Sequence, residues 1–151
     1  MLKPTKILVP TDFSEYSDRA LRQALDIAKQ YKAKVFLLHV IHGEGYFATG
    51  DFAISTEIMQ QINNAALAKA QESLDKQLYS FPQAKEVEEV EVVTKVRQGV
   101  PYEEILKEAK EQQIDLIVIA SIGRSGIAKY LIGSVARNVL KGSKCPVLLT
   151  K

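Results

Sequence analysis

The chain has 151 residues and a mass of 16.8 kDa, and 46% of its residues are hydrophobic and 25% charged. These values are typical of an ordinary globular protein, and the length favours a single domain spanning residues 1–151. The net charge of +2 is too small for the basic surface of a nucleic-acid-binding protein, so we expect any bound anion to be small.

Cysteine content and apolar run lengths exclude further classes of protein. Cys145 is the only cysteine, which excludes an internal disulfide and a multi-thiolate metal site. No apolar run approaches the roughly 18 to 20 residues that span a membrane, and residues 1–6 lead into a strand-like run without the long apolar stretch of a signal peptide. We therefore expect a cytoplasmic protein.

In the first half of the chain, short apolar runs alternate with segments of helical periodicity. Residues 7–9 form the first predicted strand, which Pro10 closes, and a helix begins near Ser14, a common capping residue type. Residues 35–41 form the second strand. A loop with three glycines then leads to a long helix, capped near Ser55 or Thr56, with an apolar stripe at Ile58, Ile62, Ala65, Ala66, Leu74 and Leu78.

The second half continues this alternation. Residues 86–97 turn to a period of two, with charged residues on one face, which favours a strand at a sheet edge. Pro101 begins the next helix, in which we interpret Glu103 and Glu104 as surface residues. Residues 116–119 form an apolar strand, a helix through 135–140 ends at Gly142, and residues 147–149 form the last strand.

Apolar strands separated by helices predict an α/β fold with a doubly wound, five-stranded parallel sheet and helices on both faces. We expect the strand order 3-2-1-4-5. In that order the first and fourth strands are neighbours whose following helices lie on opposite faces, so a crevice opens at their carboxyl ends. The least ordinary residues of the sequence fall at those two strand ends.

The first of these groups is the turn after the first strand, Pro10-Thr11-Asp12. Asp12 places a carboxylate at the rim of the sheet, where it could accept hydrogen bonds from the hydroxyl pair of a sugar. The alternative interpretation is that Asp12 only accepts hydrogen bonds from backbone donors in its own turn.

The second group follows the fourth strand. A glycine-containing loop over residues 120–127 precedes Gly133-Ser134-Val135, which opens a helix. Glycines allow close approach of the backbone to a phosphate, and the N–H groups of Ser134 and Val135 lie at the positive end of the helix dipole. The alternative is a glycine-rich turn in which Ser134 is an ordinary N-cap.

The two groups meet at one predicted crevice, which favours a nucleotide bound between them. No G-x-G-x-x-G follows the first strand, and no G-x-x-x-x-G-K-[ST] occurs in the chain. The sequence therefore predicts neither a Rossmann dehydrogenase nor a P-loop NTPase.

These residues make the chain resemble the universal stress protein family over essentially its whole length. The resemblance rests on Ile-Leu-Val-Pro-Thr-Asp-Phe-Ser at 7–14, His-Val at 39–40, Gly-x-Pro at 99–101, and the closing Gly-Ser-Val and Pro-Val-Leu-Leu. The ATP-binding signature of that family, Gly-x2-Gly-x9-Gly-[Ser/Thr], maps onto Ala120, Gly123, Gly133 and Ser134 with its spacing intact. Alanine replaces the first glycine, and Ile122 stands where many relatives have histidine.

The resemblance implies a doubly wound nucleotide-binding domain for ATP, or another adenine nucleotide, with Mg²⁺. Pro10, Thr11 and Asp12 would border the adenosine, with Asp12 toward the ribose. The backbone of Val40 would meet the adenine edge. The implied cofactor-binding residues are Pro10, Thr11, Asp12, Val40, Ala120, Gly123, Arg124, Gly133, Ser134 and Val135. Arg124 would add positive charge near the phosphates.

The last strand and the histidines bear on partners and chemistry. An apolar edge at residues 147–149 would invite pairing, so we predict that the same strand of a second subunit covers it, and the resemblance also implies a homodimer. The sequence shows no nucleophile or metal ligand that would act with His39 and His42, so we interpret the two histidines as structural. We interpret Cys145 as a packed small residue.

We expect a dimeric sensor or adaptor of the stress response that binds ATP, since no residue is a candidate for positioning water in line for hydrolysis. Slow ATP hydrolysis is compatible with that expectation. Two alternatives stay open: a nucleotide-dependent hydrolase or transferase that uses Asp12 and one histidine with Mg²⁺, and an interaction protein without a nucleotide, which Ala120 and Ile122 favour.

Overall fold

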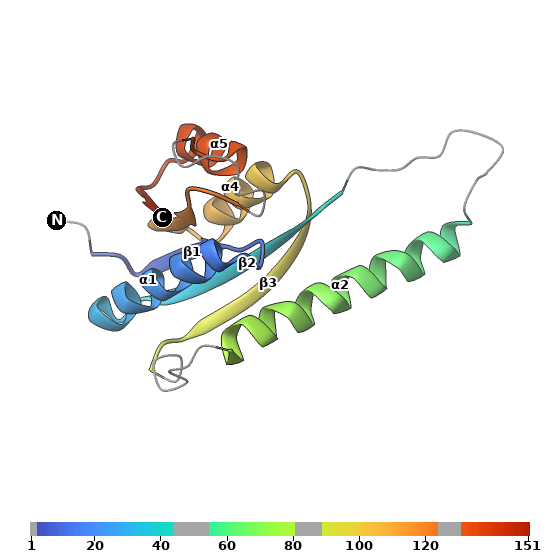
Figure 1. Cartoon of the computed structure of the whole chain (residues 1–151), viewed down its shortest axis with the longest axis horizontal. Coiled ribbons are helices and arrows are strands. Elements are labelled where there is room, and N and C mark those ends of the chain that lie inside the picture. Colours follow the sequence, from blue (N-terminus) through green and yellow to red (C-terminus); the bar gives the residue numbers. More distant parts are fainter. Residues whose placement is uncertain (1–2, 44–54, 81–88, 124–130) are drawn as a thin grey trace.

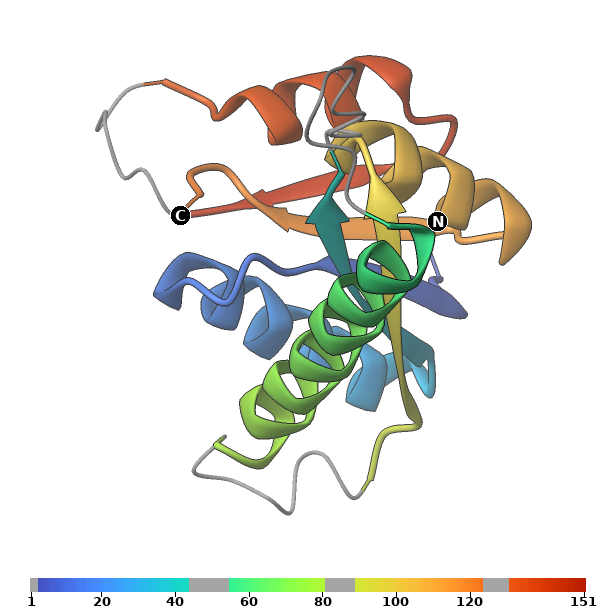
Figure 2. The ribbon, with the colours of Figure 1, turned by 90° about the vertical axis from the view of Figure 1, so that its right-hand side faces the viewer.

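A computed structural model describes residues 3–43, 55–80, 89–123 and 131–151 of the chain. Five parallel strands form one sheet in the order β3-β2-β1-β4-β5, with helices on both faces (Figures 1 and 2). This arrangement confirms the predicted fold class and strand order. The elements in chain order are β1 (Lys6–Pro10), α1 (Glu15–Tyr31), β2 (Lys34–His42), α2 (Thr56–Tyr79), β3 (Val92–Gly99), α4 (Pro101–Glu111), β4 (Leu116–Ala120), α5 (Ser134–Gly142) and β5 (Val147–Thr150).

The central strand β1 lies between β2 and β4, and its Ile7 is opposite Val35 on one side and Leu116 on the other. Leu8 and Val9 of the same strand are fully buried, because helices cover both faces of the sheet. Helices α1 and α2 cover one face, and α4 and α5 cover the other (Figure 2). Each face has its own apolar core.

Helix α1 begins where the sequence predicts. Ser14 is its N-cap, and its hydroxyl accepts a hydrogen bond from the backbone N–H of Ser17. The buried side of the helix carries an apolar stripe at Ala20, Leu21, Ala24, Leu25 and Ala28. This stripe fixes α1 against β1 and β4, so the β1–α1 turn is held at the carboxyl end of the central strand.

The N-terminal half of α2 departs from the sequence interpretation. Ser55 caps the helix as expected, and Leu74 is fully buried. Ile58 and Ile62, which are among the apolar positions that predicted this helix, are however 50% and 56% exposed. Among the described residues, this half of the helix extends past the sheet (Figure 1) and has no core beneath it.

The charged residues of β3 are paired with residues of a neighbouring helix, which the sequence did not predict. The strand lies at a sheet edge as predicted, but Lys95 and Arg97 pair with carboxylates of α4. Arg97 contacts Glu108, and it also bonds Glu104 at 2.6 Å and Glu111 at 2.9 Å. Glu108 is only 1% exposed and Glu104 is half-buried, so interpreting Glu104 as a surface residue was wrong.

These ion pairs attach α4 to the edge strand. The carboxylates around Arg97 raise its pKa above the ordinary value, with the hydrogen bond to Glu111 as the largest cause. The same bond lowers the pKa of Glu111.

Within the part of the chain that the structure describes, no helix is both long and apolar enough to cross a membrane.

Candidate functional site

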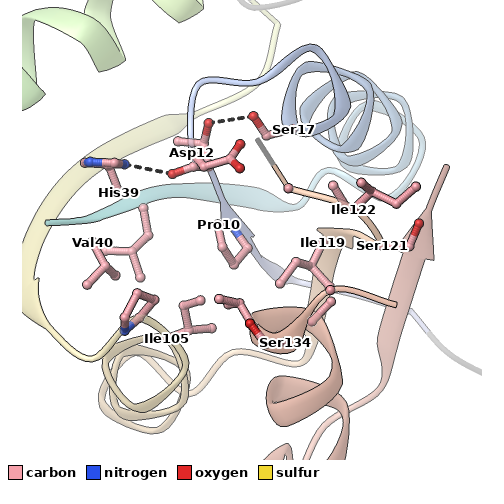
Figure 3. Close-up of a pocket in the computed structure, with 18 residues that line it drawn as sticks. Pro10, Asp12, Ser17, His39, Val40, Ile105, Ile119, Ser121, Ile122 and Ser134 are labelled. Carbon is pink, nitrogen blue, oxygen red and sulfur yellow. Dashed lines mark hydrogen bonds between the residues drawn. The ribbon is translucent and has the colours of Figure 1, made fainter. Parts of the chain in front are cut away.

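A pocket of about 400 Å³ opens at the carboxyl ends of the central strands (Figure 3). Its volume falls within the roughly 300 to 1,000 Å³ usual for small-molecule sites. Nine of the ten residues predicted for the site line this pocket, and Arg124 lies outside the described residues. The predicted residues that the pocket brings together are Pro10, Thr11, Asp12, Val40, Ala120, Gly123, Gly133, Ser134 and Val135.

The β1–α1 turn forms one wall of the pocket. Oδ1 of Asp12 accepts a hydrogen bond from the N–H of Ser14 at 3.0 Å, and the hydroxyl of Thr11 accepts one from the N–H of Phe13 at 3.1 Å. Phe13 has a φ of 63°, a left-handed conformation that is rare for a bulky side chain. Asp12 therefore supports its own turn, as the alternative interpretation held, and also lines the pocket.

The loop after β4 forms the opposite wall. The N–H of Ser121 donates to the carbonyl of Thr150 at 2.8 Å, and the N–H of Gly133 donates to the carbonyl of Ser121 at 2.7 Å. The two ends of the loop are thereby joined. A Cβ on Gly133 would lie 3.4 Å from that Ser121 carbonyl, an ordinary van der Waals contact, so the space at this position can take a small side chain.

The start of α5 completes this wall. Gly133 is the N-cap and has no side chain to accept a hydrogen bond, and Ser134 is the first helical residue. Interpreting Ser134 as an N-cap was therefore wrong. Within the described part of the chain no side-chain cap meets the first-turn N–H groups, and they lie at the positive end of the helix dipole. This geometry suits an anion.

A third wall, from α4, was not predicted as part of the site. Pro101 and Ile105 line the pocket together with Val40 of β2 and Ile119 of β4 (Figure 3). Together they give one end of the pocket an apolar surface. The segment Gly99-Val100-Pro101 could have indicated this wall. It begins the helix after β3, and the helices that follow parallel strands all start at the carboxyl end of the sheet, where the pocket lies.

His39 and Cys145 take part in packing contacts. Nδ1 of His39 lies 2.8 Å from the carbonyl of Thr11, and because a carbonyl only accepts, Nδ1 must carry the hydrogen. The imidazole ring also packs 4.3 Å from the ring of Phe13. Sγ of Cys145 lies 3.4 Å from the hydroxyl of Ser143. Among the described residues, no group of three or more His, Cys, Asp or Glu could hold a metal ion.

Comparison with known proteins identifies the family. Residues 4–151 match the model of the universal stress protein family. Universal stress protein MJ0531 of Methanocaldococcus jannaschii is 34% identical over 97% of this chain and 81% of its own length. The solved structure of MJ0577, from the same organism, superposes with a TM-score of 0.81 at 31% identity, over 99% of this chain and 97% of that one.

A further solved relative carries a ligand. A universal stress protein solved in complex with cAMP superposes with a TM-score of 0.63 at 25% identity, over 99% of this chain and 98% of its own. The family match covers nearly every residue of the chain, and all three walls of the pocket lie within it. The chain therefore belongs to the universal stress protein family.

Proposed function

We propose that this protein is a single-domain, cytoplasmic adenine-nucleotide-binding protein that takes ATP with Mg²⁺ and acts as a dimeric sensor or adaptor in a stress response. One observation carries the proposal. The turn with Asp12 and the uncapped start of α5 line the same pocket, although about 120 residues separate them in the chain. A carboxylate and a helix N-terminus that line one pocket suit the ribose and the phosphate of one nucleotide.

The chemistry of the pocket changes from one end to the other in a way that suits a nucleotide. Val40, Pro101 and Ile105 offer apolar surface to a flat base. Asp12 can accept hydrogen bonds from ribose hydroxyls, and the backbone at Ser134 can donate to phosphate oxygens. Three successive parts of the ligand would thus meet three different surfaces.

Ala120 and Mg²⁺ are compatible with this arrangement. Ala120 is half-buried at the end of β4 and lines the pocket, so its methyl group occupies one side of the space without filling it. Asp12 is the only carboxylate among the described lining residues. Mg²⁺ would therefore enter with the phosphates, whose charge it neutralises, instead of occupying a separate protein site.

Support from relatives concerns the same class of ligand. The family member solved with cAMP shares the fold at 25% identity. We extend adenine-nucleotide binding to this chain because residues at the carboxyl ends of β1 and β4 line its pocket. We propose binding without efficient turnover, since the described lining residues after β4 and at the start of α5 carry no carboxylate or imidazole that could position water beside a phosphate.

The dimer would form through β5. This strand is at the outer edge of the sheet, paired only with β4 within the described chain, and its Leu148 is 37% exposed. An open edge with an apolar side chain is a template for another strand. A second copy of β5 would satisfy that edge by two-fold symmetry.

Calorimetric titration tests the proposed function. The purified protein, stripped of nucleotide, is titrated with MgATP and with AMP, and mass spectrometry identifies any small molecule that the unstripped protein releases on denaturation. We expect saturable binding near one nucleotide per chain, or a released adenylate. Absence of both would overturn the proposal and favour an interaction protein in which the loop after β4 has only a structural role.

A further inference from the structure

A buried set of hydrogen bonds joins α2 to the turn that carries Asp12. Gln77 of α2 is 7% exposed. Thr11, to which Gln77 is bonded, is 6% exposed, and Ser17, which also contacts Thr11, is 2% exposed. Oε1 of Gln77 lies 2.9 Å from the hydroxyl oxygen of Thr11, and Nε2 lies 2.6 Å from Oδ1 of Asp18. Gln77 does not line the pocket, but Thr11 does.

The amide of Gln77 can have only one orientation here. Nε2 must face Asp18, since the reverse orientation would place an amide oxygen 2.6 Å from a carboxylate oxygen. Oε1 then faces Thr11 and can only accept. The hydroxyl hydrogen of Thr11 is therefore donated to Gln77.

Ser17 is a second possible acceptor for this hydroxyl, at a slightly longer distance. Its oxygen lies 3.0 Å from the Thr11 hydroxyl, and because its own hydrogen is donated to the carbonyl of Ser14 at 2.8 Å, that oxygen can accept from Thr11 when Gln77 is lost. With its hydrogen committed to Gln77, the Thr11 oxygen presents a lone pair to the N–H of Phe13 at 3.1 Å. That bond holds Phe13 in its left-handed conformation.

We infer that Gln77 is a positioning residue for the nucleotide site: through Thr11 it holds the Phe13 turn and thereby keeps the Asp12 carboxylate in place. The inference rests on the proposed function, because Asp12 is assigned there to the ribose. A buried glutamine could simply complete the packing of α2. Gln77 differs from such a residue because its bond ends on Thr11, whose hydroxyl accepts from the N–H of Phe13.

The experiment compares Gln77→Met with Gln71→Met. Gln71 is on the same helix, and its Nε2 donates to Thr94 of β3 at 2.9 Å, so its loss also removes a bond between α2 and the sheet. Hydrogen exchange of the Phe13 amide is followed by NMR in the nucleotide-free protein. We expect that exchange to be about tenfold faster in Gln77→Met than in Gln71→Met, since only the first variant removes the nearer acceptor of the Thr11 hydroxyl and leaves it only Ser17.

Comparing the affinities for two nucleotides, with and without ribose hydroxyl groups, tests whether the turn acts on the ribose. Calorimetry measures binding of ATP and of 2′,3′-dideoxy-ATP, which lacks the hydroxyl groups that Asp12 would accept. For Gln77→Met we expect about tenfold weaker binding of ATP and about twofold weaker binding of the dideoxy nucleotide. Equal losses for both ligands would overturn the inference that Gln77 acts through Asp12.

A rescue variant keeps the inference testable if Gln77→Met does not fold. The double substitution Gln77→Glu with Asp18→Asn keeps an acceptor toward Thr11 and reverses the donor and acceptor in the second contact. We expect exchange of the Phe13 amide within about threefold of that in the unmodified protein. Exchange as fast as in a Thr11→Val variant would overturn the inference.

Failure of the proposed function has a different signature. If the unmodified protein binds neither ATP nor the dideoxy nucleotide, the proposed function is overturned, and the inference that Gln77 serves a nucleotide site fails with it. If the unmodified protein binds ATP but the Phe13 amide exchanges equally in Gln77→Met and Gln71→Met, only the inference about Gln77 is overturned.

Discussion

Asp12 and Gly123 lie next to each other in the lining of the pocket, and a Cβ atom on Gly123 would lie 3.0 Å from Oδ2 of Asp12. The two residues follow β1 and β4, which are neighbours in the sheet. The helices that follow these strands, α1 and α5, lie on opposite faces of the sheet. The contact between Asp12 and Gly123 therefore lies where the β1–α1 turn meets the loop after β4.

Substitution of Gly123 tests this spacing. In Gly123→Ala, the new methyl group would push the Asp12 carboxylate aside, and we expect about tenfold weaker nucleotide binding by calorimetry. The melting temperature should change little, because a carboxylate end can move. Gly43→Ala is a matched control, since its Cβ would meet only the flexible side chain of Gln98, at 3.1 Å. Equal affinities in the two variants would place the ligand elsewhere.

A carboxylate at the start of α5 should have opposite effects on stability and on affinity. Aspartate is a good N-cap, so Gly133→Asp should leave the melting temperature unchanged or slightly raised. Its negative charge would repel a phosphate, and we expect nucleotide affinity to fall at least about 100-fold. Gly133→Asn has a similar shape and no charge, so its loss should be clearly smaller. Similar losses would indicate a steric effect.

Ala120 is the position at which the chain departs from the family signature. Ala120→Gly removes one methyl group from the pocket, so we expect ATP affinity to stay the same or to rise by up to about threefold. The protein should become less stable by about 0.5–1 kcal/mol, because glycine at the end of a strand increases the entropy of the unfolded chain. A clear loss of affinity would show that the signature is wrongly aligned here.

The ion pairs between β3 and α4 should contribute strongly to stability. Arg97→Met removes the arginine from three carboxylates and leaves Glu108, which is 1% exposed, paired only with Lys95, so we expect a loss of about 2 kcal/mol in the free energy of unfolding. Arg19→Met removes an exposed pair with Glu15 and should cost less than about 0.5 kcal/mol. Urea denaturation at pH 7 measures both. Equal losses would show that burial of Glu108 is unimportant.

The same cluster predicts a dependence on pH. Arg97 lowers the pKa of Glu111 in the folded protein below its ordinary value. A carboxyl group of this kind stabilises the fold above its unfolded pKa, and the contribution is lost as the pH falls through the folded pKa. We therefore expect the free energy of unfolding to fall with acidification below about pH 4.5. This fall should be smaller in Glu111→Gln than in the unmodified protein.

The proposed dimer is tested at the exposed position of β5. Leu148→Lys places a charge on the open edge, and we expect the mass from sedimentation at micromolar concentration to fall from dimer to monomer. Leu131→Lys, on a residue that is 68% exposed and outside the strand, is the control and should remain dimeric. A monomeric unmodified protein, or an unchanged mass for Leu148→Lys, would contradict the dimer.

Local patterns predicted much of the fold. The cap at Ser14 and the first helical turn at Pro101 depend on neighbouring residues, and apolar runs such as 116–119 predicted buried strands, so the strand order followed from general rules of parallel sheets. The same order brings the strand ends with Asp12 and Gly123 together, which is why the predicted residues line one pocket.

The errors share a physical cause, because they concern how far one element covers another. Ile62 follows the helical period of Leu74 but lies beyond the sheet, and periodicity does not show where a neighbouring element ends. Arg97 is charged and follows an exposed pattern, yet α4 covers it with three carboxylates. Ile105 belongs to a core stripe, and its place in the pocket depends on the packing of α4.

The central place of β1 has a consequence for folding. Its partner β2 is near in sequence, since Ile7 pairs with Val35, but its other partner is far away, since the same residue pairs with Leu116. The carboxylate of Asp115 reinforces this distant junction by accepting hydrogen bonds from the N–H groups of Thr5 and Lys6. Contacts so distant in sequence are entropically costly and form late.

A ligand that lies between the ends of β1 and β4 would bridge the N-terminal and C-terminal halves of the chain. Only a chain in which those halves have already joined can bind it, so its binding free energy adds directly to the stability of that junction. Nucleotide concentration in the cell would then influence how long the protein survives unfolding and proteolysis, in addition to any signal that the bound state transmits.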